Sequence, residues 1–191
     1  MHHAKKVACS VMAIIAVVLN NSDKSHNTQQ VGDVFINNKL VGHLIVSPAA
    51  LKVIGDAESC MRTPYRCPAG LTTDGIGNTH RVTGKIKSDH EIAVDWTENI
   101  ITAQNCLTAS TNASLMSQGQ IDAFTSFIFN TGCTRFKRNS DGSETRIFKN
   151  IQNHHFDAAC YELHYWVYAN GNKLPGLVNR RKKETELCLA H

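Results

Sequence analysis

Apolar blocks alternate with polar stretches along this chain, and the spacing inside each block predicts a structural element. An uncharged apolar run covers residues 7–19, and a polar stretch covers residues 20–32. Two shorter apolar runs then flank an Asn-Asn-Lys sequence, which predicts a small β-hairpin over residues 34–46. An apolar segment and a hairpin therefore precede the main body of the chain.

Helical spacing of apolar residues predicts the first helices of the main body. Ser47 followed by Pro is typical of a helix start, and we expect this helix to end near Cys60, which puts Glu58 in its last turn. Two Ser-x-x-Glu/Gln capping boxes, at residues 88–91 and 117–120, predict the starts of two longer helices.

Glycines and later periodic segments complete the prediction. Residues 65–82 contain Gly70, Gly75 and Gly77 among Thr and Ile, which predicts a small antiparallel sheet with tight turns. Further helices are expected over residues 144–153, 156–166 and 175–189. The sum is an α+β fold with a small antiparallel β-sheet lobe and a larger helical lobe.

The apolar run near the start resembles a membrane-targeting segment. Lys5 and Lys6 form a positive flank before 13 uncharged residues. A helix of that length spans about 20 Å, less than the roughly 30 Å of a bilayer core, so lipid would hold it weakly. The residues after Leu19 lack the small-x-small pattern of signal cleavage, which favours an uncleaved anchor over a cleaved signal peptide. The lysines would stay in the cytoplasm, with the remainder outside the inner membrane.

Charge and cysteine content narrow the function classes. The 191 residues carry a net charge of +4. This mild positive charge is compatible with an acidic partner such as cell-wall polymer, but it is explained equally well by a need for solubility. It is too weak to indicate binding to nucleic acid. Seven cysteines without a C-x-x-C pair argue against a zinc ribbon. An odd count leaves one thiol free at full oxidation, so we expect structural disulfides and one special thiol in an oxidising compartment.

The strongest candidate chemistry lies in Glu58, Cys67 and Thr73, which are separated by eight and then five residues. Splitting a glycosidic bond requires an acid for the leaving oxygen and a second group that handles water or the sugar cation. Glu58 would be the general acid, and Thr73 would hold the attacking water. Taken alone, Glu58 would be interpreted as an ordinary surface residue and Thr73 as an ordinary strand residue. The spacing of the whole motif favours a catalytic role for both. Cys60 lies beside this motif, and a Cys60–Cys67 disulfide would block the second catalytic group.

Three blocks of sequence resemble the phage-type lysozymes of glycoside hydrolase family 24. They are the Glu-x8-Cys-x5-Thr spacing, the stretch CPAGLTTDGIGNTH and the ending LPGLVNRRKKETELCL. More narrowly, the three blocks resemble the signal-arrest-release endolysins of tailed phages. The resemblance implies three segments: a membrane segment over residues 1–22, a linker with a hairpin over 23–46, and a lysozyme-like catalytic domain over 47–191. The hairpin looks like an addition.

The family usually has Asp where this chain has Cys67, although its secreted subgroup often has Cys. A thiol with a pKa of about 8.5 is mostly protonated at neutral pH, so Cys67 could act as a base toward water or as a nucleophile. The resemblance implies a muramidase that hydrolyses the β-1,4 bond between N-acetylmuramic acid and N-acetylglucosamine in peptidoglycan, for host cell lysis and phage release. Such a muramidase needs no cofactor, and we expect the protein to be a monomer.

Two other functions remain open. Cys67 with His80 as base would suit a cysteine-dependent peptidoglycan amidase or peptidase, and a non-enzymatic, disulfide-rich wall-binding protein is the third class. The ten histidines lack an H-E-x-x-H motif, so surface histidines are favoured over a metal site. The basic run over residues 180–183 is interpreted as a solvated helix face rather than a wall-binding patch.

The cysteines predict a switch. While residues 7–19 lie in the bilayer, Cys9 is out of reach and Cys60–Cys67 is the inhibitory disulfide. After release into the periplasm, Cys9 would attack Cys60 and free Cys67, as the resembling endolysins with this cysteine layout suggest. A fixed Cys60–Cys67 staple is the alternative. The structural disulfides are expected to join the pairs Cys106–Cys133 and Cys160–Cys188.

Overall fold

A computed structural model of the chain describes residues 6–23, 29–66 and 70–190. Cys67, the candidate second catalytic group, lies outside the described residues.

The predicted α+β fold is confirmed: small antiparallel sheets accompany a majority of helix. The helices are α1 Val11–Asn20, α2 Pro48–Asp56, α3 Asp89–Ser110, α4 Gln118–Thr131, α5 Cys133–Lys137, α6 Arg146–Gln152, α7 Phe156–Glu162 and α8 Pro175–Cys188. The short 3₁₀ helices are η1 Ala113–Leu115 and η2 Leu163–Tyr165.

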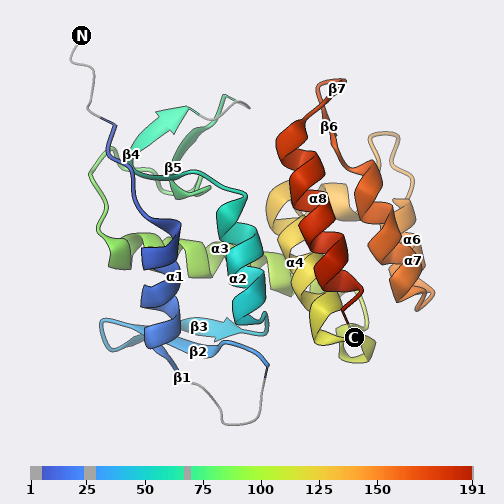
Figure 1. The fold of residues 1–191 in the computed structure, drawn as a ribbon, viewed down its shortest axis with the longest axis horizontal. Coiled ribbons are helices and arrows are strands. Elements are labelled where there is room, and N and C mark those ends of the chain that lie inside the picture. Colours follow the sequence, from blue (N-terminus) through green and yellow to red (C-terminus); the bar gives the residue numbers. More distant parts are fainter. Residues whose placement is uncertain (1–5, 24–28, 67–69, 191) are drawn as a thin grey trace.

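Within the described ranges, the strands form three small antiparallel sheets. The strands are β1 Ser22–Asp23, β2 Gly32–Ile36, β3 Lys39–Leu44, β4 Cys60–Arg66, β5 Thr72–Ile76, β6 Tyr168–Ala169 and β7 Asn172–Lys173. Their orders are β1-β2-β3, β4-β5 and β6-β7. Figure 1 shows α1, α2 and β1–β5 on one side of the molecule and α4–α8 on the other, with the long α3 crossing behind.

Two apolar clusters support these two sides. One joins α1, α2 and the hairpin to the first half of α3 and includes Ile14, Leu51 and Trp96. The other joins the second half of α3 to α4, α5, α6, α7 and α8 and includes Phe124 and Phe136. Since α3 contributes to both clusters, its 22 residues form the shared wall between the lobes. Both predicted capping boxes are present, at the start of α3 and of α4.

The apolar run near the N-terminus is part of the protein core in this structure. In α1, Ile14 and Val18 are fully buried and Ile15 is nearly so. Within the described residues, no helix is long and apolar enough to cross a membrane. The hairpin predicted over residues 34–46 is confirmed as β2 and β3, and Val34, Ile36 and Leu44 from it enter the same apolar cluster as α1.

The region around the candidate site differs from the prediction in two respects. Helix α2 ends at Asp56 instead of continuing to Cys60, so Glu58 follows the helix rather than occupying its last turn. The sheet predicted over residues 65–82 instead begins at Cys60 and ends at Ile76. Cys60 pairs with Ile76 in this sheet, which requires extended backbone from Cys60 on and so leaves no room for a further helical turn.

Candidate active site

Glu58 occupies the short connection between α2 and β4, where its two carboxylate oxygens have different neighbours. Its Oε1 accepts a hydrogen bond of 2.8 Å from Nη1 of Arg180 in α8, and its side chain is 22% exposed. Its Oε2 faces Gly77, because a Cβ atom added to Gly77 would lie 3.2 Å from it. Gly77 also has a φ of +67°, which favours glycine. The two oxygens therefore have different surroundings: one is bound by a cation and the other faces backbone.

Arg180 belongs to a buried network rather than to a solvated helix face, so the interpretation of the basic run is wrong for its first half. The Arg180 side chain is 2% exposed and donates through Nε to Glu184 Oε1 at 3.0 Å. Nη2 of Arg180 donates to the carbonyl oxygen of Ser126 in α4, also at 3.0 Å. Glu184 is fully buried, so α8, α4 and Glu58 are connected through charged hydrogen bonds out of water.

Arg181 is buried on the same helix. It bonds to Glu184 and Asn130, and its guanidinium lies 4.8 Å from the centre of the Phe127 ring. Burial lowers the pKa of Arg181 to about 10, against the raising effect of Glu184. Lys182 is exposed, as expected for the run. Only the second half of the basic run is therefore solvated, because the period of 3.6 residues turns the first two side chains inward.

Thr73 lies in β5, opposite Tyr65 of β4, and is 2% exposed. Its hydroxyl donates to the carbonyl oxygen of Leu71 at 3.2 Å. Four residues later the chain reaches Gly77, so Thr73 and the backbone that faces Glu58 belong to one strand and turn. The structure thus places Glu58 and the Thr73–Gly77 segment in the same lobe.

A buried ion network braces that turn. Asp74 is fully buried, and its Oδ1 accepts from Asn78 at 2.7 Å and from Lys87 Nζ at 2.9 Å. Lys87 also donates to Asp95 of α3 at 2.5 Å. Burial acts to lower the pKa of Lys87, but the hydrogen bonds to Asp74 and Asp95 outweigh it and raise that pKa. Asn99 of α3 donates to Asn78, so the turn is attached to α3 at two points.

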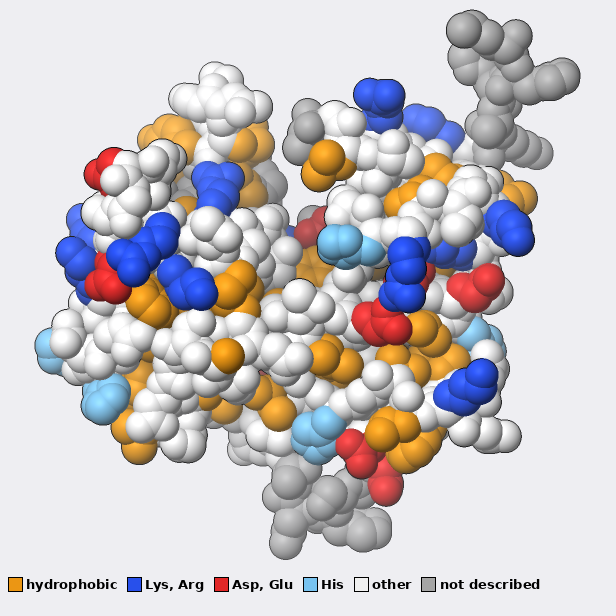
Figure 2. Space-filling view, turned by 180° about the vertical axis from the view of Figure 1, so that it is seen from behind, with side chains coloured by type: hydrophobic (Ala, Val, Ile, Leu, Met, Phe, Trp, Pro, Cys, Tyr) orange, Lys and Arg blue, Asp and Glu red, His pale blue; other side chains and the backbone are white. Residues whose placement is uncertain are grey.

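A surface pocket extends from Gly77 between the lobes. His80 and Thr79 line it beside Gly77, Asn99 and Thr102 line it from α3, and Phe129 lines it from α4. Seen from behind, the molecule is hollowed between its two lobes (Figure 2). Gly77 both lines this pocket and faces Glu58, so the carboxylate lies one residue away from the pocket wall. Among the described residues, no group of three or more His, Cys, Asp or Glu could hold a metal ion.

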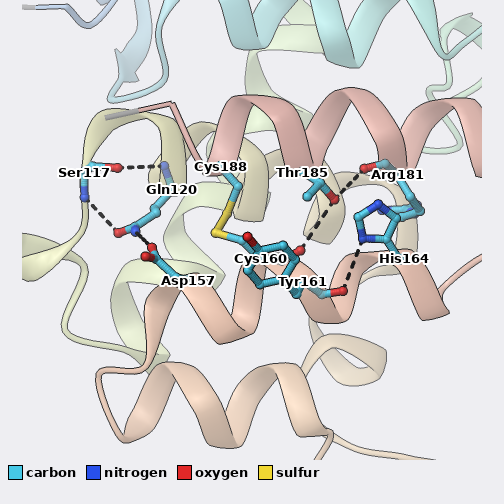
Figure 3. The surroundings of a disulfide bond; sticks show 9 residues. All are labelled: Ser117, Gln120, Asp157, Cys160, Tyr161, His164, Arg181, Thr185 and Cys188. Carbon is cyan, nitrogen blue, oxygen red and sulfur yellow. Dashed lines mark hydrogen bonds between the residues drawn. A yellow bond between two sulfur atoms is a disulfide. The ribbon is translucent and has the colours of Figure 1, made fainter.

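Among the described cysteines, three disulfides join segments that are distant in sequence. Cys106–Cys133 links α3 to α5, and Cys160–Cys188 links α7 to α8, as expected from chain order. In Figure 3 the latter bond lies beside a hydrogen bond from the Thr185 hydroxyl to the Cys160 carbonyl oxygen. The third bond is Cys9–Cys60, with an S–S distance of 2.02 Å, so Cys60 is not bonded to Cys67 in this structure. This is the pairing expected after release.

A family model for phage lysozyme matches residues 55–184, which include Glu58, Thr73 and Arg180. The chain belongs to the phage lysozyme family. The resemblance and the predicted enzyme class, a lysozyme-type glycoside hydrolase, are thereby confirmed. The chain is 37% identical to a SAR-endolysin of Escherichia phage P1 over 95% of this chain and 90% of that protein. It is 39% identical to a SAR-endolysin of Haemophilus phage HP1 over 75% of this chain and 81% of that protein.

Solved structures agree with these relatives. The active form of the P1 phage endolysin Lyz aligns with a TM-score of 0.77 at 36% identity, covering 96% of this chain and 95% of that chain. The secreted inactive form of the same endolysin aligns with a TM-score of 0.55 at 40% identity, covering 74% of this chain and 93% of that chain. The alignment with the active form therefore covers more of this chain and has the higher TM-score.

Sequence reasoning missed Arg180 as the partner of Glu58. The two residues are 122 positions apart, and nothing local connects them. A signal did exist in α8, because Arg180 and Glu184 are four residues apart, a spacing that brings opposite charges together on one helix face. A charge paired in this way can be buried, whereas the basic residues at 182 and 183 pair only at the surface.

Proposed function

We propose that this protein is a phage endolysin that hydrolyses the β-1,4 bond between N-acetylmuramic acid and N-acetylglucosamine in peptidoglycan, lysing the host cell and releasing phage. The observation that carries this proposal is the carboxylate of Glu58, held by Arg180 at one oxygen and facing Gly77, beside the pocket between the lobes. Membership of the phage lysozyme family supports the reaction class. The proposed enzyme is a monomer and uses no cofactor.

The geometry suggests how Glu58 acts. Because Arg180 occupies Oε1, the proton for the leaving sugar oxygen would be carried by Oε2, on the side of Gly77. The second group would be Cys67, acting on water or on the sugar, with Thr73 positioning the water. The buried network of Lys87, Asp74 and Asn78 holds the Thr73–Gly77 turn while the substrate is bound.

Product analysis on purified peptidoglycan tests the function directly. A muramidase releases new reducing ends, a cysteine-dependent amidase or peptidase releases new amino groups, and a wall-binding protein releases neither. Glu58→Gln keeps an oxygen for Arg180 but has no acidic proton to transfer to the leaving sugar oxygen, so we expect lytic activity to fall by about 10²–10⁴-fold or more with the fold unchanged. The matched control is Glu186→Gln, an exposed acid on α8, which should retain full activity. Substantial lysis by folded Glu58→Gln protein would contradict the assignment.

We also propose that the enzyme is made in a restrained form, in the host inner membrane and facing the periplasm. Residues 7–19 would hold it there weakly, and a Cys60–Cys67 disulfide would block the second catalytic group. After release, the Cys9 thiolate attacks Sγ of Cys60; the Cys9–Cys60 bond forms as the Cys60–Cys67 bond breaks. Cys67 leaves as a thiolate that can take up a proton, so no external oxidant is needed. The Cys9–Cys60 bond and the similarity to the active form of a relative support this order.

A further inference from the structure

The N-terminal segment fits a surface of its own protein closely at one point. A Cβ atom added to Gly55 of α2 would lie 2.5 Å from Cγ1 of Val11, the first residue of α1, and 3.5 Å from the Trp96 ring. Real Cβ atoms do not approach so closely, and Val is stiff at χ1. Only glycine at position 55 therefore lets the start of α1 lie against α2 and Trp96.

Backbone pairing continues this fit toward Cys60. The amide of Cys9 donates to the carbonyl oxygen of Cys60 at 3.0 Å, and the amide of Arg62 donates to the carbonyl oxygen of Val7 at 2.7 Å. The Val7 amide in turn donates to the Thr63 hydroxyl at 3.1 Å. Residues 7–9 thus lie antiparallel to β4, with a β-bridge between Ala8 and Met61. This register puts Cys9 directly beside Cys60, where their bond forms.

The hairpin holds the other end of the segment. Asn21 directly follows α1, and its carbonyl oxygen accepts from the Phe35 amide of β2 at 2.7 Å. The next two residues, Ser22 and Asp23, form β1 and pair with β2. Val34 of the hairpin is fully buried in the same apolar cluster as Ile14 of α1. The hairpin, to which the sequence alone assigns no role, therefore fixes the C-terminal end of α1.

We propose that Gly55, Trp96 and the β2–β3 hairpin form an internal receptor for the N-terminal segment after it leaves the membrane. The steric fit at Gly55 then determines whether Cys9 reaches Cys60, since α1 must be seated before residues 7–9 can align with β4. This inference rests on the membrane stage proposed above. It adds that release alone is not sufficient: the freed segment has to be captured, and Gly55 is the residue that permits capture.

Four versions of the full chain test the receptor in cells: wild type, Gly55→Ala, Val11→Ala and the double variant. Non-reducing peptide mapping gives the fraction with the Cys9–Cys60 bond, and fractionation gives the membrane-bound fraction. The overpacked Gly55→Ala contact should lower the ratio of Cys9–Cys60 to Cys60–Cys67 pairing about tenfold and delay lysis. Val11→Ala alone should behave as wild type. The double variant should recover, because removing the Val11 methyl groups makes room for the added methyl.

The outcomes are distinguishable. Wild-type levels of Cys9–Cys60 in Gly55→Ala would overturn the receptor, and so would a double variant as impaired as Gly55→Ala, since the methyl would then act elsewhere. The double variant also controls for any effect of the added methyl on Glu58, because it keeps that methyl. If wild type never appears with the membrane, the membrane stage of the proposed function fails, while the disulfide comparison still decides whether the Gly55 contact governs docking.

Discussion

The carboxylate of Glu58 is oriented by a single guanidinium that also serves Glu184 and Ser126. Arg180 is 2% exposed and distributes its hydrogen bonds over α8, α4 and the connection between α2 and β4. The planar fork of Arg suits this arrangement, since a lysine ammonium could not hold the same fixed geometry. Orientation of the acid and cohesion between α8 and α4 therefore depend on the same side chain.

Arg180→Met should consequently impair both activity and stability. Removing one cation from a buried ion network leaves the buried Glu184 carboxylate poorly compensated and costs about 3–5 kcal/mol of unfolding free energy. Urea unfolding measures that loss, and the rate of peptidoglycan cleavage by the remaining folded protein measures the loss of Glu58 orientation. Lys182→Met, on the exposed face of α8, should change the unfolding free energy by no more than about 0.5 kcal/mol. Equal behaviour of the two variants would argue against the role of Arg180.

Spacing along the chain predicts some of the candidate site residues and misses others. Glu58, Cys67 and Thr73 lie within 16 positions, so their order along the chain is a usable signal. Arg180 reaches Glu58 only because α8 folds back against α2, and no local pattern reports such a contact. The close approach of Gly77 to Glu58 likewise exists only in the folded protein.

Helix α2 is attached to α4 through the residue that caps the N-terminus of α2. The Ser47 hydroxyl caps α2, and Asp122 of α4 accepts from both the amide and the hydroxyl of Ser47, the amide at 2.8 Å. Burial raises the pKa of Asp122, although hydrogen bonds from Ser47 and Gln118 partly oppose this. The position of the helix that leads into Glu58 is thus coupled to the protonation of one buried acid.

This coupling predicts a pH dependence. Because the pKa of Asp122 is raised on folding, the folded state binds this proton more tightly, and the associated stability is lost as pH rises through the raised pKa. Wild type should therefore gain stability relative to Asp122→Asn as pH falls from the raised pKa toward the ordinary carboxyl value of 3.8. Asp141→Asn serves as a control of opposite sign, since a hydrogen bond from Ser143 lowers the pKa of Asp141. Parallel urea titrations at several pH values measure both differences.

The two helix-linking disulfides give a second prediction at this scale. They close loops of similar length, with sequence separations of 27 and 28, so each should contribute about 3–4 kcal/mol by chain entropy. Cys160 and Cys188 are also fully buried, and replacing both with Ala leaves a cavity. Thermal unfolding should show a drop of about 10 °C for Cys106→Ala/Cys133→Ala and a larger drop for Cys160→Ala/Cys188→Ala. The reverse ranking would contradict the cavity argument.

Most elements can be predicted because their apolar period and caps are strong local signals. The capping boxes of α3 and α4 are examples. The predicted end of α2 lies four residues too late, because pairing of Cys60 with Ile76, a contact across 16 positions, decides where extended backbone begins. Helix α1 illustrates a different limit: an apolar run has the same appearance in sequence whether lipid or protein surrounds it.

For the whole molecule, the position of α1 separates two proposed states of the enzyme. Cys9→Ser removes the thiol that would free Cys67 but keeps the apolar face of α1. We expect the released Cys9→Ser protein to remain inactive, and Cys60→Ser to be active before release and toxic to the host. Culture turbidity after induction measures both effects. Lysis on schedule by Cys9→Ser would refute the switch while leaving the glycosidase assignment intact.

The double role of α1 restricts how its sequence can change during evolution. In the proposed cycle, its side chains must be tolerated by lipid at first and must later fill a closely packed protein interior. A larger apolar side chain makes insertion into lipid more favourable, whereas in a packed protein interior it causes overpacking and lowers stability. Ile14 and Val18 are fully buried, so they should resist enlargement even though lipid would favour it. Met12 is 56% exposed, so it does not have to fit a packed protein interior. Substitutions at Met12 can therefore change the timing of lysis without altering the folded enzyme.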